Sequence, residues 1–100
     1  MKTTIQEQEN QFVVRLEGEL DTAAAMETAE LLKPLYTNNG KDVLFECEKL
    51  EYISSSGLRI LVSIHKGARA CGSKVILKDV NDDLKNVFKV TGMNVFFEFV

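Results

Sequence analysis

The sequence predicts one α/β domain built on a mixed, mostly parallel β-sheet, and three observations lead to this prediction. Strand-like alternation and helix-like periodicity take turns along the chain, which indicates parallel strands joined through helical crossovers. The first two strand-like stretches follow one another directly, so they predict an antiparallel hairpin at the start. One hundred residues, 45% of them hydrophobic, can bury one core. We therefore treat residues 1–100 as a single domain.

The hairpin is predicted over residues 4–20, with its turn at Glu9 and Asn10. Apolar and mostly polar residues alternate in the second strand, which predicts that one face of the sheet is buried. The side chains on this face are Phe12, Val14 and Leu16.

A helix is predicted next, over residues 22–36, because apolar residues recur there every three or four positions. Thr22 is suited to cap its first turn. Pro34 has no amide hydrogen, and we expect it to end or kink the helix. The composition of TNNGK, residues 37–41, then predicts a turn.

The rest of the chain continues to alternate between strands and helices. Glycine directly after a helical pattern predicts the end of that helix, and asparagine before one predicts its cap. The predicted elements are a strand at 42–50 with Val43, Phe45 and Cys47 on one face, a helix from about Ser56 to Cys71 closed by Gly72, a strand at 73–80, a helix at 81–92 capped by Asn81 and ended by Gly92, and a terminal strand at 94–100.

Composition and charge exclude several classes of function. The net charge is −3 and no basic block occurs, so nucleic acid is not an expected partner. The N-terminus lacks the apolar core of a signal peptide, and no apolar run approaches the roughly 20 residues that span a bilayer. We therefore expect a cytoplasmic protein without a membrane partner. Cys47 and Cys71 stand alone in sequence, which predicts two small core residues rather than a disulfide or a metal site.

The stretch EYISSSGLRIL, residues 51–61, places three serines before a helical run. Ser55 or Ser56 could simply cap the helix. A serine nucleophile would need a base, but His65 lies ten residues after Ser55, roughly 15 Å along a straight helix. The chain also lacks a P-loop and a G-x-G-x-x-G motif. We therefore predict no catalytic residue, no cofactor and no metal.

A helical wheel separates the apolar residues of this helix into two groups. Leu58 and Val62 fall among basic residues on the same side as Ser55, which predicts an exposed ridge. The alternative is that both residues flank the core and are covered. A phosphate on Ser55 would be accommodated by the helix N-terminus, yet its charge of about −1.5 to −2 would disfavour docking on an adjacent apolar surface. The core side of the wheel contains Ile60, Leu61, Ile64, Ala68 and Cys71.

Three segments in this order, LEGELDTAAA, DVLFECEKLEYISSSGLRILVSIHKGARACGSKVILKDV and VFKVTGMNVFF, resemble the STAS family, and within it the single-domain anti-sigma factor antagonists of bacteria. The most specific part is ISSSGLRIL, where a strand ends and a serine-glycine-leucine motif opens a helix. The resemblance covers nearly the whole chain. It implies a non-enzymatic protein that binds an anti-sigma factor and releases the sigma factor. In this family the anti-sigma factor is also a serine kinase that phosphorylates the antagonist, and a PP2C-type phosphatase reverses the modification.

By position, the resemblance implies that Ser55 is the phosphorylated residue. The family often has aspartate before this serine, where this chain has Ser54, which becomes a second candidate acceptor. Asp21 occupies a family position beside the phosphorylation site, although it could equally be a turn or capping carboxylate. The residues expected to bind the anti-sigma kinase are Asp21, Ser56, Gly57, Leu58 and Val62.

Two other functions remain open from the sequence. A relative that is not phosphorylated could serve as a scaffold or as an accessory subunit of a transport complex, and the serine at position 54 keeps this alternative open. An independent serine-dependent enzyme would require that the fold bring another base to Ser55.

Overall fold

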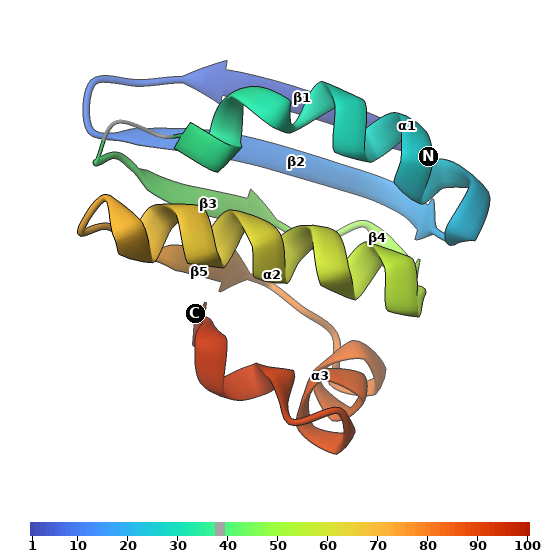
Figure 1. Cartoon of the computed structure of the whole chain (residues 1–100). Helices are drawn as coiled ribbons and strands as arrows, with labels where there is room; N and C mark the ends of the chain where they lie inside the picture. Colours follow the sequence, from blue (N-terminus) through green and yellow to red (C-terminus); the bar gives the residue numbers. More distant parts are fainter. Residues whose placement is uncertain (38–39) are drawn as a thin grey trace.

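A mixed six-stranded sheet forms the centre of the fold (Figure 1). The computed structural model describes residues 1–37 and 40–100. The strands are β1 (Lys2–Glu7), β2 (Gln11–Leu20), β3 (Asp42–Glu46), β4 (Leu50–Ile53), β5 (Val75–Lys78) and β6 (Glu98–Phe99). The helices are α1 (Thr22–Leu31), α2 (Ser55–Ala70) and α3 (Asp82–Val90), with 3₁₀ segments η1 (Lys33–Thr37) and η2 (Met93–Phe96).

The strand order is β1-β2-β3-β5-β6, with β4 also paired to β2. β1 and β2 are antiparallel, and every other pairing is parallel. The predicted fold class, with its N-terminal hairpin and helical crossovers, is confirmed.

β2 is shared between two partners along its length. Its first half pairs with β3, and its end, from Gly18 to Leu20, pairs with β4. The sequence predicted one strand over residues 42–50 and missed β4. The chain turns at residues 47–50, where the Leu50 amide donates to the Cys47 carbonyl at 3.1 Å. This turn ends β3 and lets β4 take its place beside β2.

α1 and α2 lie side by side on one face of the sheet (Figure 1). The inward side chains of β2 and β3 are buried beneath them as predicted, and so is Cys47. Cys71 is exposed, contrary to prediction. It caps the C-terminus of α2, where its amide donates back to Gly67 and Ala68, and the chain leaves the core there.

Most helix boundaries fall where the sequence placed them. α1 ends at Leu31 and Pro34 lies in η1, while Gly72 and Gly92 have φ of 77° and 75° just after α2 and α3. The predicted terminal strand is shorter, because η2 replaces its first half. The predicted turn at TNNGK includes residues 38–39, which lie outside the described residues. Within the described part of the chain, no helix has the length and apolar character needed to cross a membrane.

Candidate functional site

Two helices begin next to one another at one end of the sheet (Figure 1). α1 starts where β2 ends, and α2 starts where the neighbouring strand β4 ends. The Ser54 amide donates to the Leu20 carbonyl at 2.8 Å, which joins the two starting points. Asp21 and Ser54, the N-caps of α1 and α2, are therefore neighbours.

Ser54 is the N-cap of α2, whereas the sequence had placed the cap at Ser55 or Ser56. Its hydroxyl oxygen accepts a hydrogen bond from the Gly57 amide at 3.1 Å. The residue is only 8% exposed. The Ser54 hydroxyl is therefore occupied and screened from solvent.

Ser55 is the first residue of α2 and is exposed, and Ser56 after it is half-buried. The one-residue shift of the cap leaves Ser55 inside the first helical turn, where backbone amides lack intrahelical acceptors. Of the three serines, Ser55 presents the most open side chain to a partner.

Gly57 is buried, and its lack of a side chain allows the first turn of α2 to approach the strand ends. A Cβ at this position would lie 2.8 Å from Leu20 Cγ and 2.9 Å from Ile53 Cγ1. Even alanine would therefore push α2 away from β2 and β4. Within the serine motif, this glycine sets the distance between the helix and the sheet.

Leu58 does not belong to an exposed ridge, and that prediction was wrong. It is 3% exposed and is part of the hydrophobic core, while Val62 is half-buried against the core. α2 packs on α1 and η2 as well as on the sheet, so its buried arc is wider than the stripe read from the wheel. A Leu58→Asp change would bury a carboxylate, and we expect it to unfold the domain.

Asp21 caps α1, where its Oδ1 accepts a hydrogen bond from the Ala24 amide at 2.8 Å. The sequence had assigned this cap to Thr22, which is instead the exposed first residue of the helix. Asp21 is half-buried beside Ser54. The structure thus brings it to the serine cluster and also gives it a structural role.

Tyr52 is a surface residue of this site that sequence reasoning missed. It lies in β4, two residues before Ser54, pairs in register with Glu19 and is 49% exposed. A large aromatic side chain so open to solvent is a common anchor for protein partners. The sequence EYI already places an exposed Tyr52 next to the buried Ile53. Because β4 was not predicted from the sequence, this alternation was not recognised.

His65 does not approach the serines and is engaged elsewhere. Its ring contacts Phe96 in a tilted arrangement with centroids 5.1 Å apart, and it meets Phe97 edge-on at 5.9 Å. This burial, followed by the positive charge of Arg69, lowers the pKa of His65 below 6.5. In residues 1–37 and 40–100, no group of three His, Cys, Asp or Glu residues could hold a metal ion.

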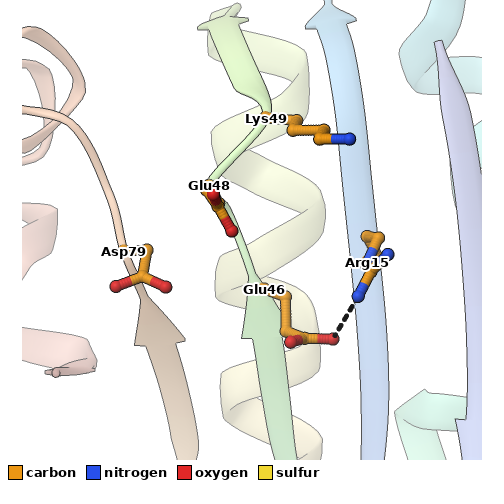
Figure 2. Close-up of a pocket in the computed structure, with 5 residues that line it drawn as sticks. All are labelled: Arg15, Glu46, Glu48, Lys49 and Asp79. Atoms are coloured by element: carbon orange, nitrogen blue, oxygen red, sulfur yellow. Dashed lines mark ion pairs between the residues drawn. The ribbon is translucent and has the colours of Figure 1, made fainter.

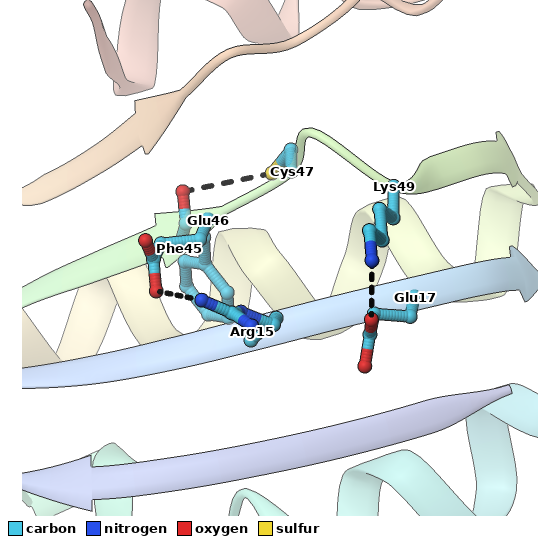
Figure 3. Close-up of polar contacts among 6 residues, drawn as sticks. All are labelled: Arg15, Glu17, Phe45, Glu46, Cys47 and Lys49. Atoms are coloured by element: carbon cyan, nitrogen blue, oxygen red, sulfur yellow. Dashed lines mark hydrogen bonds and ion pairs between the residues drawn. The ribbon is translucent and has the colours of Figure 1, made fainter.

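A polar hollow of about 260 Å³ lies on the sheet face opposite α2 (Figure 2). Its lining carries charges of both signs, from Arg15, Glu46, Glu48, Lys49 and Asp79. Arg15 pairs with Glu46 at 3.7 Å, and Lys49 pairs with Glu17 of β2 at 3.8 Å (Figure 3). These partly exposed pairs join neighbouring segments, and each contributes at most about 1 kcal/mol.

Between the lining residues Glu46 and Glu48 in the chain, the buried Cys47 has its thiol 3.7 Å from the Phe45 carbonyl (Figure 3). Burial, followed by the negative charge of Asp79, raises the pKa of Cys47 to about 12. The thiol is thus protonated at neutral pH and unsuited to act as a nucleophile.

Comparison with known proteins gives consistent results. Residues 2–100 match the model of the STAS domain. An anti-sigma-B factor antagonist of Staphylococcus aureus is 27% identical over 86 residues, which cover 86% of this chain and 80% of the relative.

Solved structures of low sequence identity share the fold. The anti-sigma factor antagonist SpoIIAA in its unphosphorylated form superimposes with a TM-score of 0.74 at 20% identity, covering 88% of this chain and 82% of that one. An anti-sigma factor antagonist from Mycobacterium paratuberculosis superimposes with a TM-score of 0.79 at 18% identity, covering 98% of this chain and 83% of that one. The match over 99 of the 100 residues, together with the architecture described above, shows that this chain belongs to the STAS-domain family.

Proposed function

We propose that this protein is an anti-sigma factor antagonist whose binding is switched off by phosphorylation of Ser55. The observation that carries the proposal is the contrast between Ser54 and Ser55. Ser54 is buried and bonded as the helix cap, while Ser55 is exposed in the first turn of α2. The name of the relative, anti-sigma-B factor antagonist, supports an anti-sigma factor as the partner. That this partner is also a serine kinase is part of our proposal.

The local electrostatics suit a removable phosphate. The first turn of α2 contains no acidic residue, so a phosphate on Ser55 would meet backbone amides without a like charge from α2 itself and would be held without unfolding the domain. It would also add about −1.5 to −2 charges to the docking surface at neutral pH. Binding of an apolar or acidic partner surface would then become unfavourable, and a PP2C-type phosphatase would restore it.

The residues of this site would contribute in two ways. Exposed or half-buried side chains would contact the partner, and these are Ser55, Ser56, Val62, Tyr52 and the flank of Asp21. Gly57 and Leu58 are buried, so they would act by holding the first turn of α2 in position.

Phosphorylation by the cognate anti-sigma kinase with ATP tests the proposal. Intact-mass measurement should show one added phosphate on the parent chain and on Ser54→Ala, but none on Ser55→Ala. Incorporation into Ser55→Ala equal to that of the parent would disprove the site. Stable binding to the kinase without any incorporation would instead favour the scaffold alternative.

Docking can be tested separately from the modification. Tyr52→Ala and Val62→Asp are expected to weaken binding of the unphosphorylated chain to the kinase, with the melting temperature as the control for folding. Glu27→Ala, an exposed change elsewhere on α1, should leave binding unaltered. Unchanged affinity of both test variants would place the docking surface elsewhere.

A further inference from the structure

The last part of the chain bears apolar side chains that the core does not cover. Val90 at the end of α3 is 77% exposed, and Val95 in η2 is 76% exposed. Phe96 and Val100 are also exposed. Single exposed apolar residues are common, but four within eleven residues form an unusual concentration on so small a domain.

A hollow of about 190 Å³ opens within this segment, between α3 and the chain end. It is lined by Phe99 and Asn94 together with Lys85 and Lys89. The two exposed lysines are four residues apart and so lie on the same side of α3. Neither has an ion-pair partner among residues 1–37 and 40–100, whereas Lys41 and Lys74 are paired at 2.6 and 3.0 Å.

We infer that this basic apolar surface, made of Lys85, Lys89, Asn94 and Phe99 with Val90 and Val95 next to them in the chain, docks an acidic amphipathic segment of a protein partner. Apolar side chains of such a segment would enter the hollow above Phe99. Its carboxylates would complement the two unpaired ammonium groups. Both lysines are otherwise solvated, so pairing them adds attraction without breaking an existing bond.

This surface is distinct from the serine site. It is formed by α3, η2 and β6, whereas Ser55 and Asp21 stand at the starts of α2 and α1. Binding there does not depend on the phosphorylation state of Ser55. The inference thus adds a second docking surface to the proposed function and does not rest on it.

An anionic membrane is a poorer match for the same residues. Asp82 and Asp83 occupy the first turn of α3, Glu98 lies in β6, and the whole chain carries a net charge of −3. These charges oppose approach to a negative bilayer, whereas a short acidic segment can contact the two lysines and avoid the aspartates.

A designed peptide tests the inference. The probe is a capped 16-residue helix with leucines on one face and glutamates on the other, titrated into the full ¹⁵N-labelled chain. Amide shifts are expected at Lys85, Lys89, Asn94 and Phe99, and Lys85→Glu/Lys89→Glu should weaken binding at least tenfold. Ser55→Glu should bind as the parent does.

Matched controls make each outcome decisive. Lys2→Glu/Lys66→Glu makes the same charge change at two exposed lysines on β1 and α2 and should keep the parent affinity. A peptide with lysines in place of the glutamates should not bind. The inference would be overturned if the acidic peptide did not bind or if the amide shifts occurred at other residues. An equal loss of peptide affinity in both double variants would overturn it as well. Recruitment to phosphatidylglycerol vesicles through Lys85 and Lys89 would overturn it in favour of a membrane.

Discussion

At the scale of single residues, the three adjacent serines have three different environments. Ser54 is buried and bonded to the Gly57 amide, Ser55 is exposed, and Ser56 is half-buried. A hydroxyl that already caps a helix is a poor phosphate acceptor. Before a kinase could phosphorylate it, its hydrogen bond to the Gly57 amide would have to break, and the helix would lose its cap. The serine in place of the family's usual aspartate therefore preserves the cap and removes a negative charge from it.

This difference predicts a clear loss of stability for one substitution and almost no change for its neighbour. Ser54→Ala leaves the Gly57 amide without its acceptor, and we expect a loss of about 0.5–2 kcal/mol of unfolding free energy. Ser55→Ala should change it by less than about 0.5 kcal/mol, as exposed substitutions usually do. Urea denaturation of both variants provides the measurement. Equal losses would mean that the cap is shared between the two hydroxyls.

Gly57 gives a second prediction, based on distance. A methyl group there would lie within 2.9 Å of carbons in Leu20 and Ile53, and we expect Gly57→Ala to lower the unfolding free energy by about 1–3 kcal/mol. The gain in helix propensity, about 1 kcal/mol, only partly offsets this overpacking. Ser63→Ala, an exposed change within the same helix, is the control. If the Gly57→Ala protein were as stable as the parent, the side chains of Leu20 and Ile53 would have to move aside at no cost in free energy.

At the scale of elements, η2 is held against α2 by aromatic contacts. The ring of His65 in α2 contacts both Phe96 and Phe97, and its Nδ1 is buried without a hydrogen-bond partner among the described residues. Protonation would place a positive charge next to apolar rings and close to Arg69. The attachment of the C-terminal segment should therefore weaken in acid.

The expected pH dependence follows from the lowered pKa of His65. In the unfolded chain His65 binds a proton near pH 6.5, whereas in the folded chain it does so only at lower pH. Neutral His65 therefore favours folding above pH 6.5, and this contribution to stability is lost as the pH falls from 6.5 towards the lower pKa of the folded state. Relative to His65→Phe, which keeps a ring and cannot titrate, the parent should lose stability between pH 7.5 and 5.5. Urea midpoints at both pH values measure this, and parallel changes in the two proteins would contradict it.

At the scale of the whole molecule, the two cysteines differ in when they can react. Cys71 is accessible in the folded protein, whereas Cys47 becomes accessible only on unfolding. Cys71 is exposed after α2, while Cys47 is buried with a pKa raised to about 12. At pH 8 a disulfide reagent should modify one thiol of the native protein at once and the second only as the domain unfolds. Cys71→Ser should abolish the fast reaction. Two fast thiols in the parent would show that the end of β3 opens without global unfolding.

Local periodicity predicted the fold well but predicted the details of the site poorly. The hairpin, the crossovers and the cap at Asn81 depend on neighbours in sequence, and each was found as expected. Leu58 is buried in the core, which draws residues from many elements, and the cap at Ser54 depends on where β4 ends. Such features arise from contacts between distant segments, which a helical wheel drawn for one element does not include.

The division of β2 between β3 and β4 has a consequence for motion. β4 has four residues and, among residues 1–37 and 40–100, pairs only with β2, yet Asp21 and Ser54 are fixed where these two strands end. β3 is instead hydrogen-bonded on both sides, by β2 and β5. Backbone amides in β4 are therefore expected to exchange with solvent faster than those in β3, because the end that carries the serines can open while the central sheet stays closed.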